Sequence, residues 1–160
     1  MAHLLTLSAH LPDVDLEQGA ILIEEGTRTG SMWVLQSGSL EVLKGDVLIN
    51  TIDRPGAAFG EVAAILGGGH SASVRASSLC RLKFAVDARA FLLGNPDVLL
   101  LVAAGLAERL DLITGYLADL RNQYSDAPGI TMVSAVLGNL IGAQSTLYQT
   151  GSRRDPDPEY

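Results

Sequence analysis

The chain contains the stretch Phe59-Gly60-Glu61-Val62-Ala63-Ala64-Ile65-Leu66, which is followed, after a run of glycines, by Ser71-Ala72-Ser73-Val74-Arg75-Ala76. The first part predicts a short helix entered through a glycine, and the second part predicts a strand joined to it by a loop. The N-terminus of a helix exposes backbone N–H groups that have no partner within the helix and can bind a negative group. This order of elements therefore predicts an anion site built from the backbone.

Polar side chains accompany these backbone donors. Glu61 places one carboxylate beside them, and Ser71 and Ser73 add two hydroxyls. A carboxylate next to an anion site is unusual unless it binds a donor of its own, such as a sugar hydroxyl. The motif therefore indicates a site for a compact sugar-phosphate ligand.

Short strands separated by turn signals are predicted for residues 20–86. Lys44-Gly45-Asp46 is a hairpin candidate, and Arg54-Pro55-Gly56 is a turn. Many short strands with regular turns are typical of a sandwich or barrel-like β unit, in which we expect Trp33 and Cys80 to be buried. The predicted strands are Ala20–Ile23, Ser31–Leu35, 39–42, Val47–Ile52, Ser71–Ala76 and Leu79–Val86, and a short helix is predicted within the first ten residues.

Helical signals begin at Asp87, which can cap a short helix that ends at Gly94. Asn95 at the cap and Pro96 at the first helical position then start a second helix. Apolar residues at spacings of three and four form one stripe along this long helix: Leu99, Val102, Leu106, Leu110, Ile113, Leu117, Leu120 and Tyr124. The stripe fits either a helix packed on its own β unit or a helix that meets a partner helix, and its regularity favours a dimer.

The predicted organisation has five parts. A helical lead-in covers residues 1–18, a β-roll with the anion site covers 19–94, and the long helix covers 95–126 with a possible dimer seam. Ala127-Pro128-Gly129 ends that helix, and residues 127–148 form an amphipathic tail in which residues 131–144 are helical. Residues 149–160 are polar and contain prolines, so we expect them to be disordered.

Composition excludes several classes of protein. The net charge of −7 and the presence of only two lysines argue against a nucleic-acid surface, which needs clustered positive charge. The longest apolar run, residues 98–107, is too short to cross a membrane, which takes about 20 residues. A single cysteine fits a reducing compartment. We therefore expect a soluble, cytoplasmic protein with no nucleic-acid or membrane partner.

Catalysis is also disfavoured. The three histidines, His3, His10 and His70, have no metal-ligand spacing, and no Ser/His/Asp or Cys/His set is evident. We therefore expect neither a metal nor catalytic residues, and a cupin-like metal enzyme is the least favoured reading.

The motifs resemble, in order and spacing, those of the cyclic nucleotide-binding domain of the catabolite activator protein superfamily. The likeness covers roughly residues 15–124. The matching pieces are Glu25-Gly26 after a strand, Trp33-Val34-Leu35-Gln36-Ser37-Gly38-Ser39-Leu40-Glu41-Val42, Pro55-Gly56 before Phe59-Gly60-Glu61, Ser71–Ala76, Cys80, and Pro96 with Leu106-Ala107-Glu108-Arg109-Leu110. The resemblance implies an α+β fold: an eight-stranded antiparallel, jelly-roll-like β-roll with a short cassette helix and a long C-terminal helix.

The segment 59–74 resembles the phosphate-binding cassette of that family. By that resemblance, Gly60 and Glu61 donate backbone N–H groups to the cyclic phosphate, and the Glu61 carboxylate accepts from the ribose 2′-hydroxyl. Ser71 matches a phosphate contact, Ala72 matches a small residue beside it, and the long helix covers the base. The ligand-binding residues implied in this way are Phe59, Gly60, Glu61, Val62, Ala63, His70, Ser71, Ala72 and Thr114, with Thr114 as a polar contact to the purine.

One position departs from the family pattern. Where the family usually has an arginine, this chain has His70. An arginine binds a phosphate through two parallel charge-assisted bonds at any pH, whereas a histidine offers one donor and is only partly charged near neutrality. Arg75 is a possible substitute, although it matches a different family position.

The expected function is a regulatory module that binds cyclic AMP (cAMP) or cyclic GMP (cGMP) and signals through its C-terminal helix to a second copy or an unidentified partner protein. The alternative is a degenerate cyclic nucleotide-type domain that acts as a ligand-independent dimerisation or interaction module. The residues after Tyr124 are not basic and lack a helix-turn-helix pattern, which disfavours a transcription factor.

Overall fold

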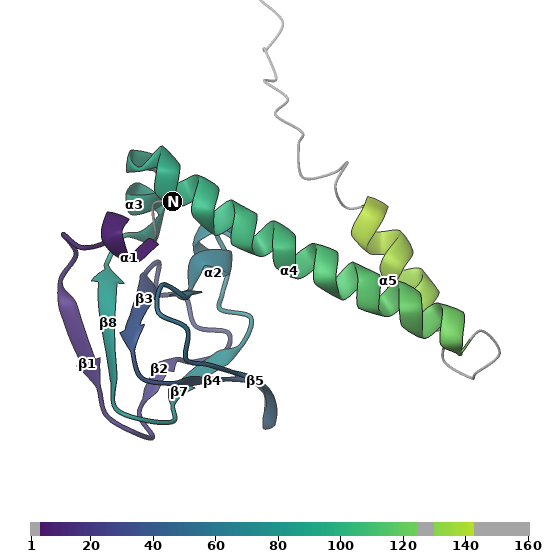
Figure 1. The fold of residues 1–160 in the computed structure, drawn as a ribbon, viewed down its shortest axis with the longest axis horizontal. Helices are drawn as coiled ribbons and strands as arrows, with labels where there is room; N and C mark the ends of the chain where they lie inside the picture. The colour runs from purple at the N-terminus through teal and green to yellow at the C-terminus, as the bar shows by residue number, and fades with distance from the viewer. Residues whose placement is uncertain (1–3, 125–129, 143–160) are drawn as a thin grey trace, which may run out of the picture. The chain divides into compact units, whose positions relative to one another are not determined.

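The computed structural model describes residues 4–124 and 130–142, and the chain divides into two compact units, residues 1–105 and 106–160. The β strands, the short helices and the start of the long helix belong to the first unit (Figure 1). The elements in chain order are α1 (Leu4–Leu7), β1 (Asp13–Leu16), β2 (Ile21–Ile23), β3 (Met32–Ser37), β4 (Leu40–Lys44), β5 (Val47–Ile52), β6 (Ala58–Phe59), α2 (Glu61–Leu66), β7 (Ser73–Ala76), β8 (Cys80–Ala85), α3 (Ala88–Gly94), α4 (Pro96–Gln123) and α5 (Ile130–Gly142).

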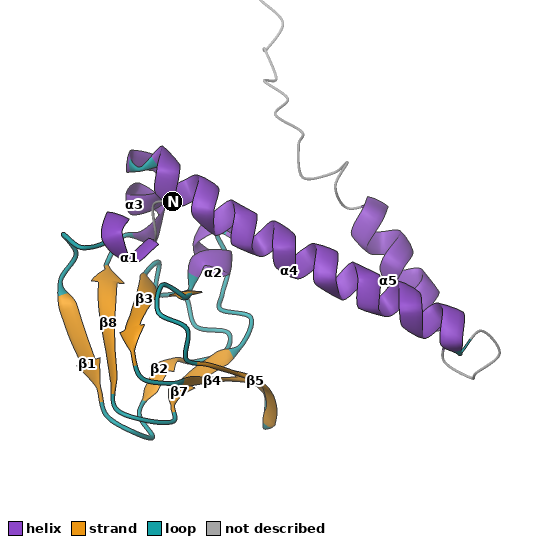
Figure 2. Cartoon of the chain, in the orientation of Figure 1, coloured by secondary structure: helices purple, strands orange, loops and turns teal. Residues whose placement is uncertain are grey.

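Two four-stranded antiparallel sheets form the roll (Figure 2). The strand order is β1-β8-β3-β6 in one sheet and β2-β7-β4-β5 in the other. Strand β4 forms a hairpin with β5, the next strand in sequence, and on its other edge it pairs with the distant strand β7. The predicted eight-stranded β-roll with a cassette helix and a long C-terminal helix is therefore confirmed.

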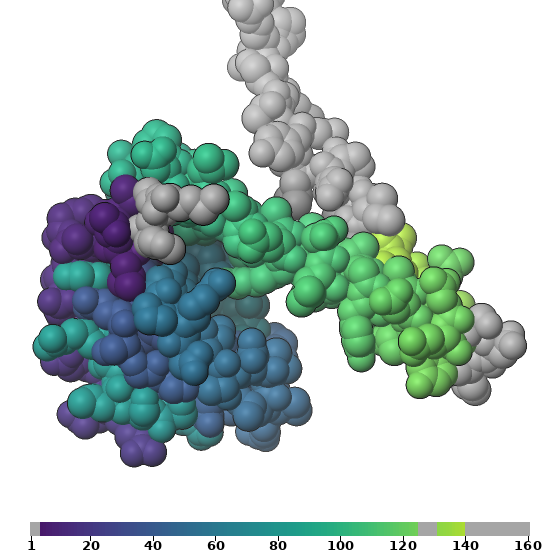
Figure 3. Space-filling view, viewed as in Figure 1, coloured from purple at the N-terminus to yellow at the C-terminus, as the bar shows by residue number. Residues whose placement is uncertain are grey.

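The core of the first unit lies between the two sheets. In the space-filling view, the atoms of this unit form a closely packed surface on the face shown (Figure 3). Both sheets contribute side chains to the core, as is usual where two sheets pack face to face. Trp33 and Cys80 are buried there, as predicted. The buried members of the cluster are Ile23, Trp33, Leu35, Leu40, Ala57, Phe59, Val74, Ala76, Cys80 and Leu82.

Two strands were not predicted from the sequence. The sequence signals place Phe59 in the cassette helix, but in the structure it belongs to β6 and lies opposite Trp33 of β3. Its ring is buried in the core. Strand β1 pairs with β8, and ion pairs of 2.9 Å join Asp13 to Lys83 and Asp15 to Arg81 across that pair. Both strands are short and depend on distant partners, so local periodicity does not reveal them.

The helix boundaries agree closely with the sequence signals. The Asp87 carboxylate accepts from the Ala90 backbone N–H at 2.8 Å and caps α3, which ends at Gly94. Pro96 begins α4, and the carbonyl of Asn95 accepts the first helical bond, from the Leu99 N–H at 3.0 Å. Helix α5 covers most of the predicted tail helix. The predicted disorder of 149–160 concerns residues outside the described part of the chain.

No single helix in the described residues is long and apolar enough to span a membrane. Helices α3 and α4 would meet that criterion only as a pair, and they are bent by 110° relative to each other.

Gly60 joins β6 directly to α2 and has a left-handed backbone, with φ of +87°. A Cβ at this position would lie 2.6 Å from the Ser31 carbonyl oxygen, well inside van der Waals contact. Both the conformation and the packing therefore require glycine here. This requirement sets the point at which the chain leaves the sheet and starts the cassette helix.

We expect Gly60→Ala to lower the free energy of unfolding by more than about 2 kcal/mol, because left-handed strain adds to a backbone clash. Gly67→Ala is the matched control: Gly67 is also left-handed, with φ of +67°, but has open space around it. That variant should lose only about 1 kcal/mol. Urea denaturation measures both values, and equal losses in the two variants would contradict the packing argument.

Candidate functional site

The two ends of the cassette come together at the start of α2. The loop after α2 returns so that the His70 ring lies 3.4 Å from the position of a Cβ on Gly60. Backbone bonds hold this return in place, because His70 N–H donates to the Thr27 carbonyl at 2.9 Å and Gly26 N–H donates to the His70 carbonyl at 2.8 Å. His70 is thereby placed beside Gly60, although it is ten positions further along the chain.

Glu61 is the first residue of α2 and is only 4% exposed. A buried carboxylate is costly unless partners compensate its desolvation. Helix α2 has six residues, so its dipole is small, and the exposed amide groups of its first turn are the main source of positive potential.

His70 is directed into the protein. Its side chain is 5% exposed, its Nε2 lies 2.8 Å from the Thr29 hydroxyl, and its ring centroid is 6.4 Å from that of Trp33. Burial lowers the pKa of the His70 imidazole below its usual value, and the negative charge of Glu61 offsets part of this shift. The residue at the family's arginine position is therefore a buried histidine that favours its neutral form.

The end of the cassette is joined to two neighbouring turns. Glu25 N–H donates to the Ser73 hydroxyl at 2.9 Å, and the Lys44 ammonium donates to the Ser71 carbonyl at 2.6 Å and to the Glu25 carboxylate. Glu25 also accepts from the Gly45 N–H at 2.9 Å. The Lys44 ammonium and, to a smaller extent, the Gly45 N–H hold the pKa of the Glu25 carboxyl below its usual range.

The remaining predicted site residues lie on three elements. Phe59 is a buried core residue of β6, Val62 and Ala63 are half-buried on α2, and Ala72 is half-buried just before β7. Thr114 belongs to the second unit, and its hydroxyl donates to the Leu110 carbonyl at 2.7 Å within α4. Such back-bonding is common for threonine in helices.

Sequence reasoning missed three residues that contact the cassette: Thr29, Glu25 and Lys44. The motif Glu25-Gly26 and the hairpin at Lys44 were recognised, but only the fold brings these turns to residues 70–73. In the part of the chain that the structure describes, no group of three or more His, Cys, Asp or Glu residues could hold a metal ion.

Because burial lowers the pKa of the His70 imidazole in the folded protein, the protein should lose stability as the pH falls from about 7 toward this lowered pKa. Below pH 6.5, its reference pKa, the unfolded chain binds a proton that the folded chain resists binding. The variant His70→Gln, which keeps a polar group near Thr29, should show a shallower decline. Urea denaturation at several pH values measures this effect.

The control is His10→Gln, since His10 is an exposed histidine beside Phe91. The free energy of unfolding of His10→Gln should change with pH as that of the wild type does. Part of that change comes from carboxylates, which are the same in both proteins. Equal slopes for wild type and His70→Gln would show that His70 does not contribute to acid sensitivity.

Comparison with solved structures gives the same fold. PKAR CBD2 bound to Sp-2Cl-cAMPS aligns with a TM-score of 0.56 at 22% identity, covering 71% of this chain and 74% of that one. The cAMP-bound PfPKA-R (141-441) aligns with a TM-score of 0.54 at 20% identity, covering 75% of this chain and 39% of that one. The regulatory domain of Toxoplasma gondii PKA with cAMP aligns with a TM-score of 0.54 at 21% identity, covering 61% and 39%.

No curated protein sequence matches this chain at a significant level. The family "Cyclic nucleotide-binding domain" matches residues 13–92, which is half of the chain and runs from β1 into α3. Together with the β-roll and its cassette, this match shows that the chain belongs to the cyclic nucleotide-binding domain family.

Proposed function

We propose that this protein is a regulatory module that binds cAMP or cGMP at its cassette. The observation that carries this proposal is the juxtaposition of Gly60 and Glu61 with His70, the residue that directly precedes Ser71 and Ala72. This arrangement supplies, in one small region, the backbone donors and the carboxylate that a cyclic nucleotide requires.

The cyclic phosphate would bind to backbone N–H groups at the start of α2 and at Ser71. Gly60 permits close approach because it has no side chain, and Ala72 presents only a methyl group. Hydrogen bonds to an ionised acceptor are shorter and stronger than those between neutral groups. The phosphate would therefore orient the ligand in the site.

The ribose would be recognised by Glu61. A buried carboxylate accepts a hydrogen bond from the 2′-hydroxyl, and this group is present in both cAMP and cGMP. A 2′-deoxy ligand would leave the carboxylate without that donor, which penalises its binding.

A route for signalling is supported by contacts between helices. Helix α2 packs against α3, and α3 is connected to α4 through Asn95. A ligand that binds one arrangement of these helices more tightly than another would shift the population toward it. The C-terminal helices would then report the occupancy of the cassette to a partner.

We expect titration with cAMP and cGMP to detect binding. Calorimetry measures the heat of binding, and thermal unfolding measures the stabilisation of the protein by the ligand. Ligand at 100 times its Kd should add about 2.7 kcal/mol to the free energy of unfolding. Glu61→Gln should weaken binding about tenfold, because it replaces a charge-assisted bond with a neutral one.

Glu24→Gln is the control, since Glu24 is exposed and lies outside the cassette. It should bind like the wild type. The absence of any shift at millimolar cAMP and cGMP would refute the proposal, and unchanged affinity in Glu61→Gln would show that the ribose does not bind at Glu61.

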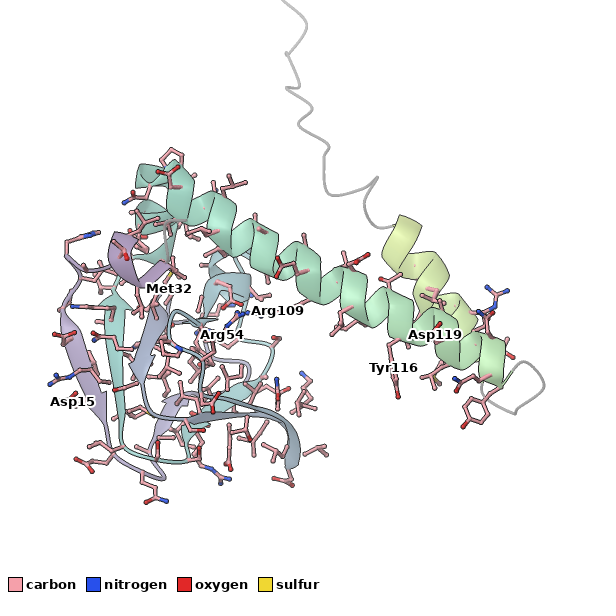
Figure 4. The ribbon with its side chains drawn as sticks, viewed as in Figure 1. Asp15, Met32, Arg54, Arg109, Tyr116 and Asp119 are labelled. Atoms are coloured by element: carbon pink, nitrogen blue, oxygen red, sulfur yellow. The ribbon has the colours of Figure 1, made fainter. Side chains whose placement is uncertain are left out.

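Helix α4 supports a second proposal, that two copies of this chain associate through the predicted apolar stripe. Leu110, Ile113 and Tyr124 of the stripe are exposed in the single chain. Tyr116, which lies off the stripe, projects away from the helix (Figure 4). A long helix with exposed apolar side chains at heptad-like spacing is typical of a coiled-coil partner surface.

Sedimentation at high micromolar concentration should therefore detect a dimer. Ile113→Glu places a charge on the stripe at a residue that is 51% exposed and should favour the monomer. Leu112→Glu, at a residue that is 77% exposed but off the stripe, is the matched control and should leave the dimer intact. A monomeric wild type excludes this interface, and loss of the dimer in Leu112→Glu alone would place the interface on another face.

A further inference from the structure

The phosphate site proposed above lacks the family's cationic side chain. His70 occupies the arginine position, but it is buried and its Nε2 is engaged with Thr29. The other candidate, Arg75, is engaged elsewhere, because its guanidinium binds the Glu41 carboxylate at 2.7 Å across the pairing of β4 with β7. Backbone amides carry only partial charges, so a nearby ammonium or guanidinium would add a stronger, charge-assisted bond to a phosphate.

Lys44 reaches the cassette from the end of β4. In the pairing of β4 with β7, Val42 lies opposite Val74 and Leu43 lies opposite Ser73. Continuing this register by one residue places Lys44 opposite Ala72.

The ammonium group of Lys44 already contacts the residue expected to bind the phosphate. Its Nζ lies 2.6 Å from the carbonyl oxygen of Ser71. The carbonyl oxygen and the amide nitrogen of one residue are about 3 Å apart. An anion that accepts a bond from the Ser71 N–H is therefore within reach of Nζ, which has a flexible four-carbon stem.

Glu25 is the group that holds Lys44 in the absence of ligand. The Lys44 side chain is 58% exposed, and exposed ion pairs contribute little to stability, so this pair is easily exchanged for another anion. Glu25 would keep its bond from the Gly45 N–H after such an exchange. Its negative charge, however, also opposes an approaching phosphate.

We propose that Lys44 supplies the positive charge for the phosphate of the cyclic nucleotide, in the role that an arginine of the cassette has in the family, and that Glu25 competes with the ligand for it. This inference rests on the proposed function of the cassette. If it is correct, Lys44 raises the affinity for the nucleotide, whereas Glu25, its partner in the ion pair, lowers that affinity.

The test is a calorimetric titration of the full chain with cAMP and cGMP. Lys44→Met keeps the length of the side chain without its charge and should weaken binding about tenfold, which corresponds to about 1.4 kcal/mol. Lys44→Arg should remain close to the wild type. Glu25→Gln should bind more tightly, because the competing charge is removed while a side-chain oxygen remains for the Gly45 N–H.

Two further measurements separate a direct contact from a structural role. Arg75→Met removes an exposed ion pair from the same sheet and should leave affinity unchanged. Added salt should weaken binding more steeply in the wild type than in Lys44→Met, since the charge that salt screens is missing from the variant. Thermal unfolding without ligand verifies that each variant is folded.

The outcomes distinguish this inference from the function on which it rests. A wild-type chain that binds neither nucleotide refutes the proposed function. If the wild type binds, equal affinities of Lys44→Met and Arg75→Met would overturn the role of Lys44. Weaker binding in both Lys44→Met and Glu25→Gln would overturn it as well, because the pair would then only hold the loop at Ser71 in place.

Discussion

The close contact between Gly60 and the carbonyl of Ser31 is the constraint on which the cassette depends. It allows β6 to stay paired with β3 while the chain turns within one residue into α2. A side chain at this point would force the two segments apart. The same missing side chain leaves room for the His70 ring, so the beginning and the end of the cassette meet at one place.

Charge in the cassette is arranged differently from what its sequence motif indicates. The histidine at the arginine position is buried among Thr29, Trp33 and Glu61, and burial favours its neutral form. The Lys44 ammonium reaches the loop from another turn and donates to the Ser71 carbonyl. In a chain with a net charge of −7, binding of an anion depends on such local donors rather than on the field of the whole protein.

Structural features that depend on one or two neighbouring residues were predicted well from the sequence. The hairpin at Gly45, the cap at Asp87 and the start of α4 at Pro96 each follow from the chemistry of one or two residues. The strands β1 and β6 were missed, because each is held by a partner far along the chain. The helix was also placed two residues early, since Phe59 fits an apolar helix face as well as it fits a buried strand.

The sequence by itself determined the class of fold, the family and the position of the cassette, because strand periodicity, turn glycines and helix caps act over a few residues. Only the tertiary structure decided which side chains surround the cassette. Thr29, Glu25 and Lys44 contact residues 70–73 through turns that are 27 to 48 residues distant in sequence. The pairing of β7 with β2 on one side and with β4 on the other brings these turns to the cassette, and such non-local pairing leaves no pattern in the sequence around any of the three strands.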